Sequence, residues 1–292
     1  MLTLFTIPKS FNGHINVIQR NAITSWTQLK PRCEVILFGD DEGVAEFARE
    51  VGVTHVSDIA KNEHGTPLLS SAFTMAKALA HNEIIGYVNS DIVILSDFIQ
   101  AVAKVTKPFF LMSGRRWDLD IKNRIDFIDN WEEKIRLAMR AHGCLHGFSG
   151  IDYFIFPRTL TINLPEFAVG RPGWDNWFIW DSKQRGIPVI DATEMITAIH
   201  QNHGYSHLRG GWKDWLQGPE SKNNFTLAGG LTQMLTLRDA DWVLKSDGVH
   251  RPSFPNLLFS SLSRFYMWRL ILAVKRNVNN ILESFFNLTH KV

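Results

Sequence analysis

Apolar and polar positions alternate along this chain in blocks that predict strands and helices in turn. Short apolar runs at 2–7, 34–38 and 84–88 have the length and the β-branched content of buried strands. Between them, the spacing of apolar residues over 14–29 and 68–80 predicts amphipathic helices. Because strand and helix follow one another in this way, we expect an α/β protein with a doubly wound, Rossmann-like mixed sheet flanked by helices.

The same pattern continues as far as residue 245. It predicts further strands at 53–56, 108–113, 153–156, 187–191, 195–199 and 242–245. It predicts further helices at 43–50, 97–105, 124–141, 175–185 and 221–236. After this the chain becomes helical, apolar and basic. We therefore predict one α/β domain at 1–245 and a C-terminal helical extension at 246–292.

Two interpretations of residues 255–288 stay open. The segment has the apolar and basic composition of an amphipathic helix that lies on a membrane surface, so a peripheral membrane contact is one expectation. The other is a helix that packs on the domain or in a dimer, because mixed-face aromatic residues are more often buried against protein.

The strand predicted at 84–88 ends in a polar triplet, Asn89-Ser90-Asp91, and a second apolar run follows at 92–95. Open α/β sheets bind ligands beyond the carboxyl ends of their strands, so this triplet is a candidate site. The alternative is a turn in which Asn89 and Asp91 bond to the local backbone. The second apolar run favours the site, because it holds the triplet between two buried segments.

Other polar residues lie at comparable positions. Arg115 and Arg116 follow the strand predicted at 108–113 and could bind phosphate oxygens, or pair with nearby acids at the surface. Asp152 follows a glycine-flanked loop and is either a ligand-binding residue or a turn residue. Trp174 and Asp175 stand in a glycine-rich turn before a helix, where Asp175 is either an N-cap or a functional carboxylate.

Composition narrows the function. The chain has 292 residues and a net charge of +2, which argues against a dedicated nucleic-acid binder. Its 2 cysteines are too few for a disulfide framework and favour a reducing compartment. Neither a signal peptide nor an uncharged apolar run of membrane-spanning length is evident. We therefore expect a cytoplasmic protein, peripheral at a membrane if residues 255–288 bind one.

The strand–triplet–strand element resembles the D-x-D element of nucleotide-sugar glycosyltransferases with the GT-A fold, of the family 2-like kind. The resemblance implies that Asp91 holds a divalent cation, Mn²⁺ or Mg²⁺, on the diphosphate of the sugar donor. Asn89 stands where these enzymes have the first acid, and its oxygen can coordinate a cation or bind a ribose hydroxyl but adds no charge. The donor-binding residues implied in this way are Thr6, Asp40, Asn89, Ser90, Asp91, Arg115 and Arg116.

The same resemblance gives roles to later residues. His203 and His200 are the leading candidates for a further metal ligand, with His207 third; histidines that cap loops or bind sugar hydroxyls are the alternative. Asp175 corresponds to the general base of inverting GT-A enzymes. The residues implied for sugar or acceptor binding are Asp152, Trp174 and Asn176.

The expected function is therefore a hexosyltransferase-type glycosyltransferase, metal-dependent and inverting. It would move a sugar from a nucleoside-diphosphate sugar to a hydroxyl of a sugar, a lipid-linked molecule or a small molecule. A non-catalytic sugar or nucleotide-sugar binding protein is the first alternative. A sugar-nucleotide pyrophosphorylase is the second, although a glycine-rich, lysine-containing phosphate loop is missing after the first strand.

Overall fold

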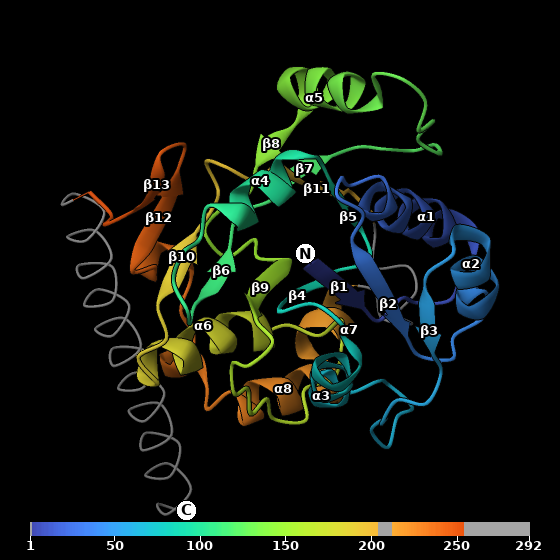
Figure 1. Ribbon diagram of the computed structural model, residues 1–292. Helices are drawn as coiled ribbons and strands as arrows, with labels where there is room; N and C mark the ends of the chain where they lie inside the picture. The colour runs from blue at the N-terminus through green and yellow to red at the C-terminus, as the bar shows by residue number, and fades with distance from the viewer. Residues whose placement is uncertain (1, 204–211, 254–292) are drawn as a thin grey trace, which may run out of the picture. The chain divides into compact units, whose positions relative to one another are not determined.

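The computed structural model describes residues 2–203 and 212–253 (Figure 1). Within them, one large sheet is built from β1 (Leu2–Thr6), β2 (Glu34–Phe38), β3 (Thr54–Val56), β4 (Ile84–Val88), β6 (Leu111–Ser113), β9 (Tyr153–Pro157), β10 (Val189–Asp191), β12 (Trp242–Lys245) and β13 (Gly248–His250). Their spatial order is β13-β12-β10-β6-β9-β4-β1-β2-β3.

This sheet is mixed and doubly wound. β1 pairs in parallel with both β2 and β4, whereas β9 runs antiparallel between β4 and β6. The chain therefore proceeds outward from β1 through β2 to β3, and then returns to place β4 on the other side of β1. That reversal is a topological switch point, where open α/β sheets bind ligands. The predicted fold class is confirmed.

A second, smaller sheet contains β5 (Ile92–Ile94), β7 (Trp117–Leu119), β8 (Cys144–Leu145) and β11 (Ala198–Gln201), in the order β5-β11-β7-β8. β11 lies antiparallel to β5 and parallel to β7, so His200 is opposite both Ile92 and Asp118. The sequence pattern predicted the apolar run at β5 but neither β7 nor β8, which are only three and two residues long.

Helices cover both faces of the large sheet. α1 (Gly13–Thr27), α2 (Val44–Val51) and α4 (Asp97–Ala103) pack in one core, and α3 (Leu69–Leu79) and α6 (Trp174–Gln184) pack in the other. β1 feeds both cores because successive strand residues point to opposite faces: Leu4 belongs to the first core and Phe5 to the second.

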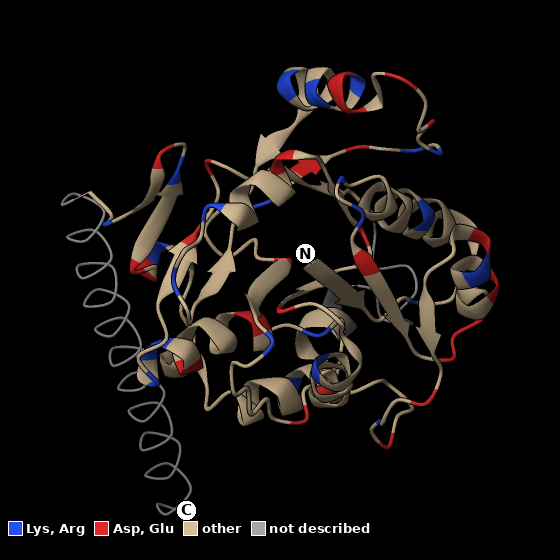
Figure 2. Cartoon of the chain, in the orientation of Figure 1, with Lys and Arg blue, Asp and Glu red and all other residues tan. Residues whose placement is uncertain are grey.

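The remaining helices are α5 (Trp131–His142), α7 (Trp212–Gln217), α8 (Pro219–Leu227) and the short 3₁₀ turns η1 (Leu231–Gln233) and η2 (Leu237–Asp239). α5 has acidic residues in its first turn and basic residues in its last turn (Figure 2). This distribution suits the helix dipole.

Two predicted helices are shorter than expected. The helix predicted at 124–141 starts at Trp131, because the Asn21 side chain binds the backbone of Asn123 and Ile125 and draws that segment onto α1. The helix predicted at 221–236 ends at Leu227, where Gly229 and Gly230 follow with φ of 72° and 80°. These left-handed conformations stop a helix and suit glycine.

Contacts divide the chain into two units, Met1–Arg251 and Pro252–Val292. The β12–β13 hairpin of the first unit continues to His250, beyond the boundary predicted at 245. The predicted membrane contact at 255–288 and most of the extension predicted at 246–292 lie outside the described residues. Within 2–203 and 212–253, no helix combines the length and the apolar character needed to cross a bilayer.

Trp26 links α1 to the strand that follows the polar triplet, because its indole N–H donates to the Ile92 carbonyl at 2.9 Å in a fully buried position. We expect Trp26→Phe to lower the free energy of unfolding by about 2–4 kcal/mol, since it leaves a cavity and a buried carbonyl without a donor. Urea unfolding measures this. Trp180→Phe, at a partly exposed indole of α6, serves as the control and should cost about 1 kcal/mol or less. Equal losses in the two variants would contradict the prediction.

Candidate functional site

Polar side chains from three distant parts of the chain meet at the switch point between β1 and β4. Lys9 lies just beyond β1, and the triplet 89–91 lies just beyond β4. Asp152 immediately precedes the antiparallel strand β9, and its carbonyl accepts a hydrogen bond from the Asn89 backbone N–H at 2.8 Å. Sheet pairing therefore brings these segments to one edge.

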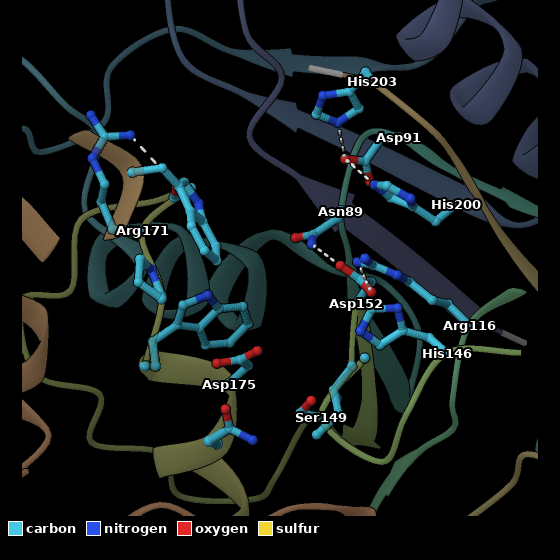
Figure 3. A pocket seen from close by; sticks show the side chains of 18 of the residues that line it. Asn89, Asp91, Arg116, His146, Ser149, Asp152, Arg171, Asp175, His200 and His203 are labelled. Atoms are coloured by element: carbon cyan, nitrogen blue, oxygen red, sulfur yellow. Dashed lines mark hydrogen bonds and ion pairs between the residues drawn. The ribbon is translucent and has the colours of Figure 1, made fainter. Parts of the chain in front are cut away.

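Two adjoining cavities open at this edge. The smaller has a volume of about 390 Å³ and contains most of the predicted site residues (Figure 3). The larger, of about 650 Å³, lies beside the loops that follow β1 and precede α3. Lys9, Gly170, Arg171 and His203 line both cavities, so two cations stand where the cavities meet.

Asp91, His200 and His203 form a cluster that fits a divalent cation. One nitrogen or oxygen from each lies within 4.8 Å of the others. The Asp91 Oδ2 atom is 3.1 Å from Nε2 of His203 and 3.7 Å from Nε2 of His200. The other oxygen of Asp91, Oδ1, is buried without a hydrogen-bond partner. Such an oxygen beside two imidazole nitrogens is a suitable donor set for Mn²⁺ or a similar cation.

Buried amides hold the backbone of this cluster in place. The Gln201 side chain donates to the carbonyls of Ile18 and Asp91 at 2.9 and 3.1 Å. Its oxygen accepts from Asn21 at 3.0 Å. Both amides are fully buried. Because their bonds join the triplet to α1 and β11, the position of Asp91 is fixed by two other elements.

Opposite charges keep the acids of the site ionised. Burial acts to raise the pKa of Asp91, but the hydrogen bond with His203 and the charge of His200 outweigh it and hold that pKa below its usual range. The pKa of Asp118 is also low, because its contacts with His200 and His146 and the charge of Arg116 outweigh its desolvation. Asp118 lies 3.2 Å from Nδ1 of His200, behind the cluster.

Asp175 lies in the first turn of α6 and lines the smaller cavity. Its environment differs from that of Asp91, because none of the described basic side chains compensates its burial. Desolvation raises the pKa of Asp175 to about 6, and backbone N–H groups only partly offset it. Its Oδ1 atom has no hydrogen-bond partner. A carboxylate with such a pKa is suited to accept a proton near neutral pH.

Nine predicted site residues line the smaller cavity together: Asn89, Asp91, Arg116, Asp152, Trp174, Asp175, Asn176, His200 and His203. Trp174 also packs in the aromatic core, where its ring is 5.2 Å from that of Tyr87, and is only 5% exposed. The Asn176 amide donates to the Leu235 carbonyl and so ties α6 to the segment between η1 and η2.

The other predicted residues line neither cavity. Thr6 is fully buried at the end of β1, and Ser90 donates to Gln19. Arg115 donates to the His146 carbonyl and lies over the Phe148 ring. Its guanidinium points away from the cavities because it finds these partners within the protein. Asp40 pairs with Lys61 at the exposed surface, and its neighbour Asp41 lines the larger cavity instead. His207 lies outside the described residues.

Several site residues carry no sequence signal strong enough to predict them. Lys9 stands in an ordinary loop after β1, and Arg171 stands in a glycine-rich turn. Gln19 is 1% exposed and binds both the N–H and the carbonyl of Lys9, at 2.6 and 2.7 Å. A polar residue on the buried face of a helix was the available signal for Gln19.

No family model matches the sequence, and neither does any curated protein. Among solved structures, the chain is similar to glucosyl-3-phosphoglycerate synthase from Mycobacterium tuberculosis, with a TM-score of 0.45 and 14% identity over 79% of this chain and 81% of that one. It is also similar to the mannosyltransferase PcManGT from Pyrobaculum calidifontis in complex with GDP-Man and Mn²⁺, with a TM-score of 0.42 and 15% identity over 68% of this chain and 56% of that one. A third similar structure is S. aureus TarS 1–349, with a TM-score of 0.40 and 12% identity over 69% of this chain and 57% of that one. The chain spans just over half the length of the latter two.

The cluster of Asp91, His200 and His203 predicts direct cation binding in the absence of any other ligand. We expect Asp91→Ala to weaken Mn²⁺ binding about 100-fold or more, because it removes the anionic donor and leaves only the two imidazoles. Electron paramagnetic resonance of free Mn²⁺ gives the affinity. His250→Ala changes an exposed histidine of β13 and should bind as the wild type does. Unchanged affinity in Asp91→Ala would exclude this cluster.

Proposed function

We propose that this protein is a glycosyltransferase that moves a hexose from a nucleoside-diphosphate sugar to a hydroxyl acceptor. In this proposal, Asp91, His200 and His203 hold Mn²⁺ or Mg²⁺. The acceptor class, whether a sugar, a lipid-linked molecule or a small molecule, is left open.

The observation that carries the proposal is the junction of the two cavities. A nucleotide-sugar has two uncharged ends joined by a diphosphate. The site has the matching order: a larger cavity for the nucleoside, a smaller one for the sugar, and Lys9, Arg171 and His203 of the cation cluster where the two meet. Cations and backbone N–H groups at such a position bind phosphate oxygens in proteins.

The cation would act as a Lewis acid that offsets negative charge on the departing diphosphate. Lys9 adds a positive charge on the side of the larger cavity. Burial lowers the pKa of Lys9, whereas the nearby Asp91 acts to raise it. Arg171 is held by Glu220 at 2.5 Å, so it reaches the junction as part of an ion pair rather than as a mobile side chain.

Asp175 is the proposed general base. It lies on the opposite side of the smaller cavity from Asn89 and Asp152 (Figure 3). There its carboxylate can take the proton of an acceptor hydroxyl while the hydroxyl oxygen attacks the anomeric carbon. Displacement of the diphosphate from the opposite face inverts that carbon. A raised pKa in a cavity supports catalysis over the alternative of a non-catalytic sugar-binding protein, which needs no base.

Lys9 tests the junction itself. We expect Lys9→Met to weaken binding of UDP-glucose or GDP-mannose about tenfold or more in the presence of Mn²⁺, because a charge-assisted contact with the diphosphate is lost. Isothermal titration calorimetry with each donor measures this. Lys61→Met is the matched control, since Lys61 pairs with Asp40 outside both cavities. If the wild type binds neither these donors nor other nucleoside-diphosphate sugars, the proposal fails.

Asp175→Asn separates donor binding from transfer. We expect donor affinity within about threefold of the wild type, but transfer or donor hydrolysis slower by about 100-fold or more. In the wild type, kcat/KM should rise with pH through about 6 as the base loses its proton. The folded-state pKa of Asp175 exceeds its unfolded value, so ionisation of this group lowers the free energy of unfolding as pH rises from about 4 to 6. Asp175→Asn removes this ionisation, so the variant should not unfold more easily than the wild type at pH 7.5. A fully active Asp175→Asn would remove the base.

A further inference from the structure

Asn89 and Asp152 are in direct contact through their side chains. Nδ2 of Asn89 donates to Oδ1 of Asp152 at 2.7 Å, and the two backbones are bonded as well. Asp152 is 6% exposed. Figure 3 shows the nitrogen of the Asn89 amide directed at Asp152 and its oxygen directed the other way. The amide thus acts as a donor to the acid and keeps its acceptor free.

The second oxygen of Asp152 accepts from Arg116, at 2.8 Å. Arg116 also donates to Asp118, which neighbours His200. Burial acts to lower the pKa of Arg116, but the charges of Asp152, Asp118 and Asp91 outweigh it and raise that pKa above its usual value. A guanidinium therefore stands charged within the field of the cation cluster. Such a charge needs an anion beside it, because a buried charge without a partner is costly.

These contacts explain why residue 89 is an amide. An aspartate at this position would place a second carboxylate against Asp152, where both acids could not remain ionised. Asparagine instead supplies one donor for Asp152 and one free acceptor. The single negative charge of the pair then resides on residue 152, where it meets Arg116.

We propose that Asn89 is a positioning residue for Asp152, and that the two form an exchangeable amide–carboxylate pair whose one negative charge neutralises Arg116 beside the Asp91–His200–His203 cluster. The geometry is compatible with either placement of the charge. With the carboxylate at position 89 and the amide at position 152, that amide can donate to position 89 and accept from Arg116. The assignment rests on the proposed function only in that the cluster is taken to bind a cation.

The test is a double-mutant cycle of Asn89→Asp, Asp152→Asn and the doubly substituted swap. Thermal unfolding without ligands and Mn²⁺ affinity by electron paramagnetic resonance are measured at one neutral pH. Asn89→Asp should lower the unfolding midpoint by about 3–8 °C, because it opposes two buried carboxylates. Asp152→Asn should weaken Mn²⁺ binding about tenfold, because Arg116 then keeps only Asp118 as a compensating anion and repels the cation more strongly.

The swap should bring the midpoint to within about 2 °C of the wild type and the Mn²⁺ affinity to within about threefold. Asn89→Asp is harmful alone but should rescue Asp152→Asn. If the two residues had a role in packing only, this rescue would not be expected. Asn12→Asp makes the same substitution at an exposed amide–carboxylate contact with Glu42, of 3.0 Å, and should shift the midpoint by about 2 °C or less.

Additive losses in the swap would overturn the pair, as would an Asn89→Asp variant as stable as the wild type. A swap that restores stability but not Mn²⁺ affinity, or a wild type that binds no Mn²⁺, would overturn the role of the charge. None of these measurements uses a sugar donor. Failure of the wild type to bind UDP-glucose, GDP-mannose or a related donor would count against the transferase alone.

Discussion

The hydrogen bonds that fix the backbone of Asp91 support the rest of the candidate site. A carboxylate at the rim of a buried sheet needs a defined position before cations or histidines can be arranged around it. Here the Gln201 amide binds the Asp91 carbonyl, and Asn21 binds Gln201 in turn. Fully satisfied buried amides of this kind favour one arrangement, because any shift leaves a polar group without a partner. The backbone of the two histidines on either side of Gln201 is held in place by the same hydrogen bonds.

Charge in the site is arranged as alternating acids and bases. Asp91 meets two histidines, Asp118 meets Arg116 and His146, and Arg116 continues to Asp152. Each acid is therefore stabilised by a neighbour of opposite charge. Asp175 stands outside this series and has no such neighbour among the described side chains, which is why its pKa moves in the other direction. Two kinds of carboxylate within one cavity allow two different roles, one in binding and one in proton transfer.

Much of the fold was predictable because strands and helices depend on local periodicity. The strand at 84–88, its polar triplet and the helix after Gly173 all have patterns that tertiary packing did not override. β7 was missed, since Trp117–Leu119 is short and its partners lie far away in sequence. For the same reason the pairing of His200 with Asp118 was not predictable, because it depends on the register of that sheet.

Placement of individual side chains was predictable only where a strand end determined it. Asp91 and Asp152 reach the cavity because β4 and β9 are neighbours. Asp40 also follows a strand, but a loop carries it to the surface and leaves Asp41 nearer the ligand space. Lys9 was missed because nothing in a single loop lysine distinguishes it from a solvated one.

The Gln19 side chain has a consequence for how a ligand would be captured. Its oxygen accepts from both the Lys9 backbone and the Ser90 hydroxyl, so one amide joins the loop after β1 to the loop after β4. These loops are therefore already ordered relative to each other before anything arrives. An anion that bridges them has little conformational entropy to remove, and more of its contact energy is left to appear as affinity.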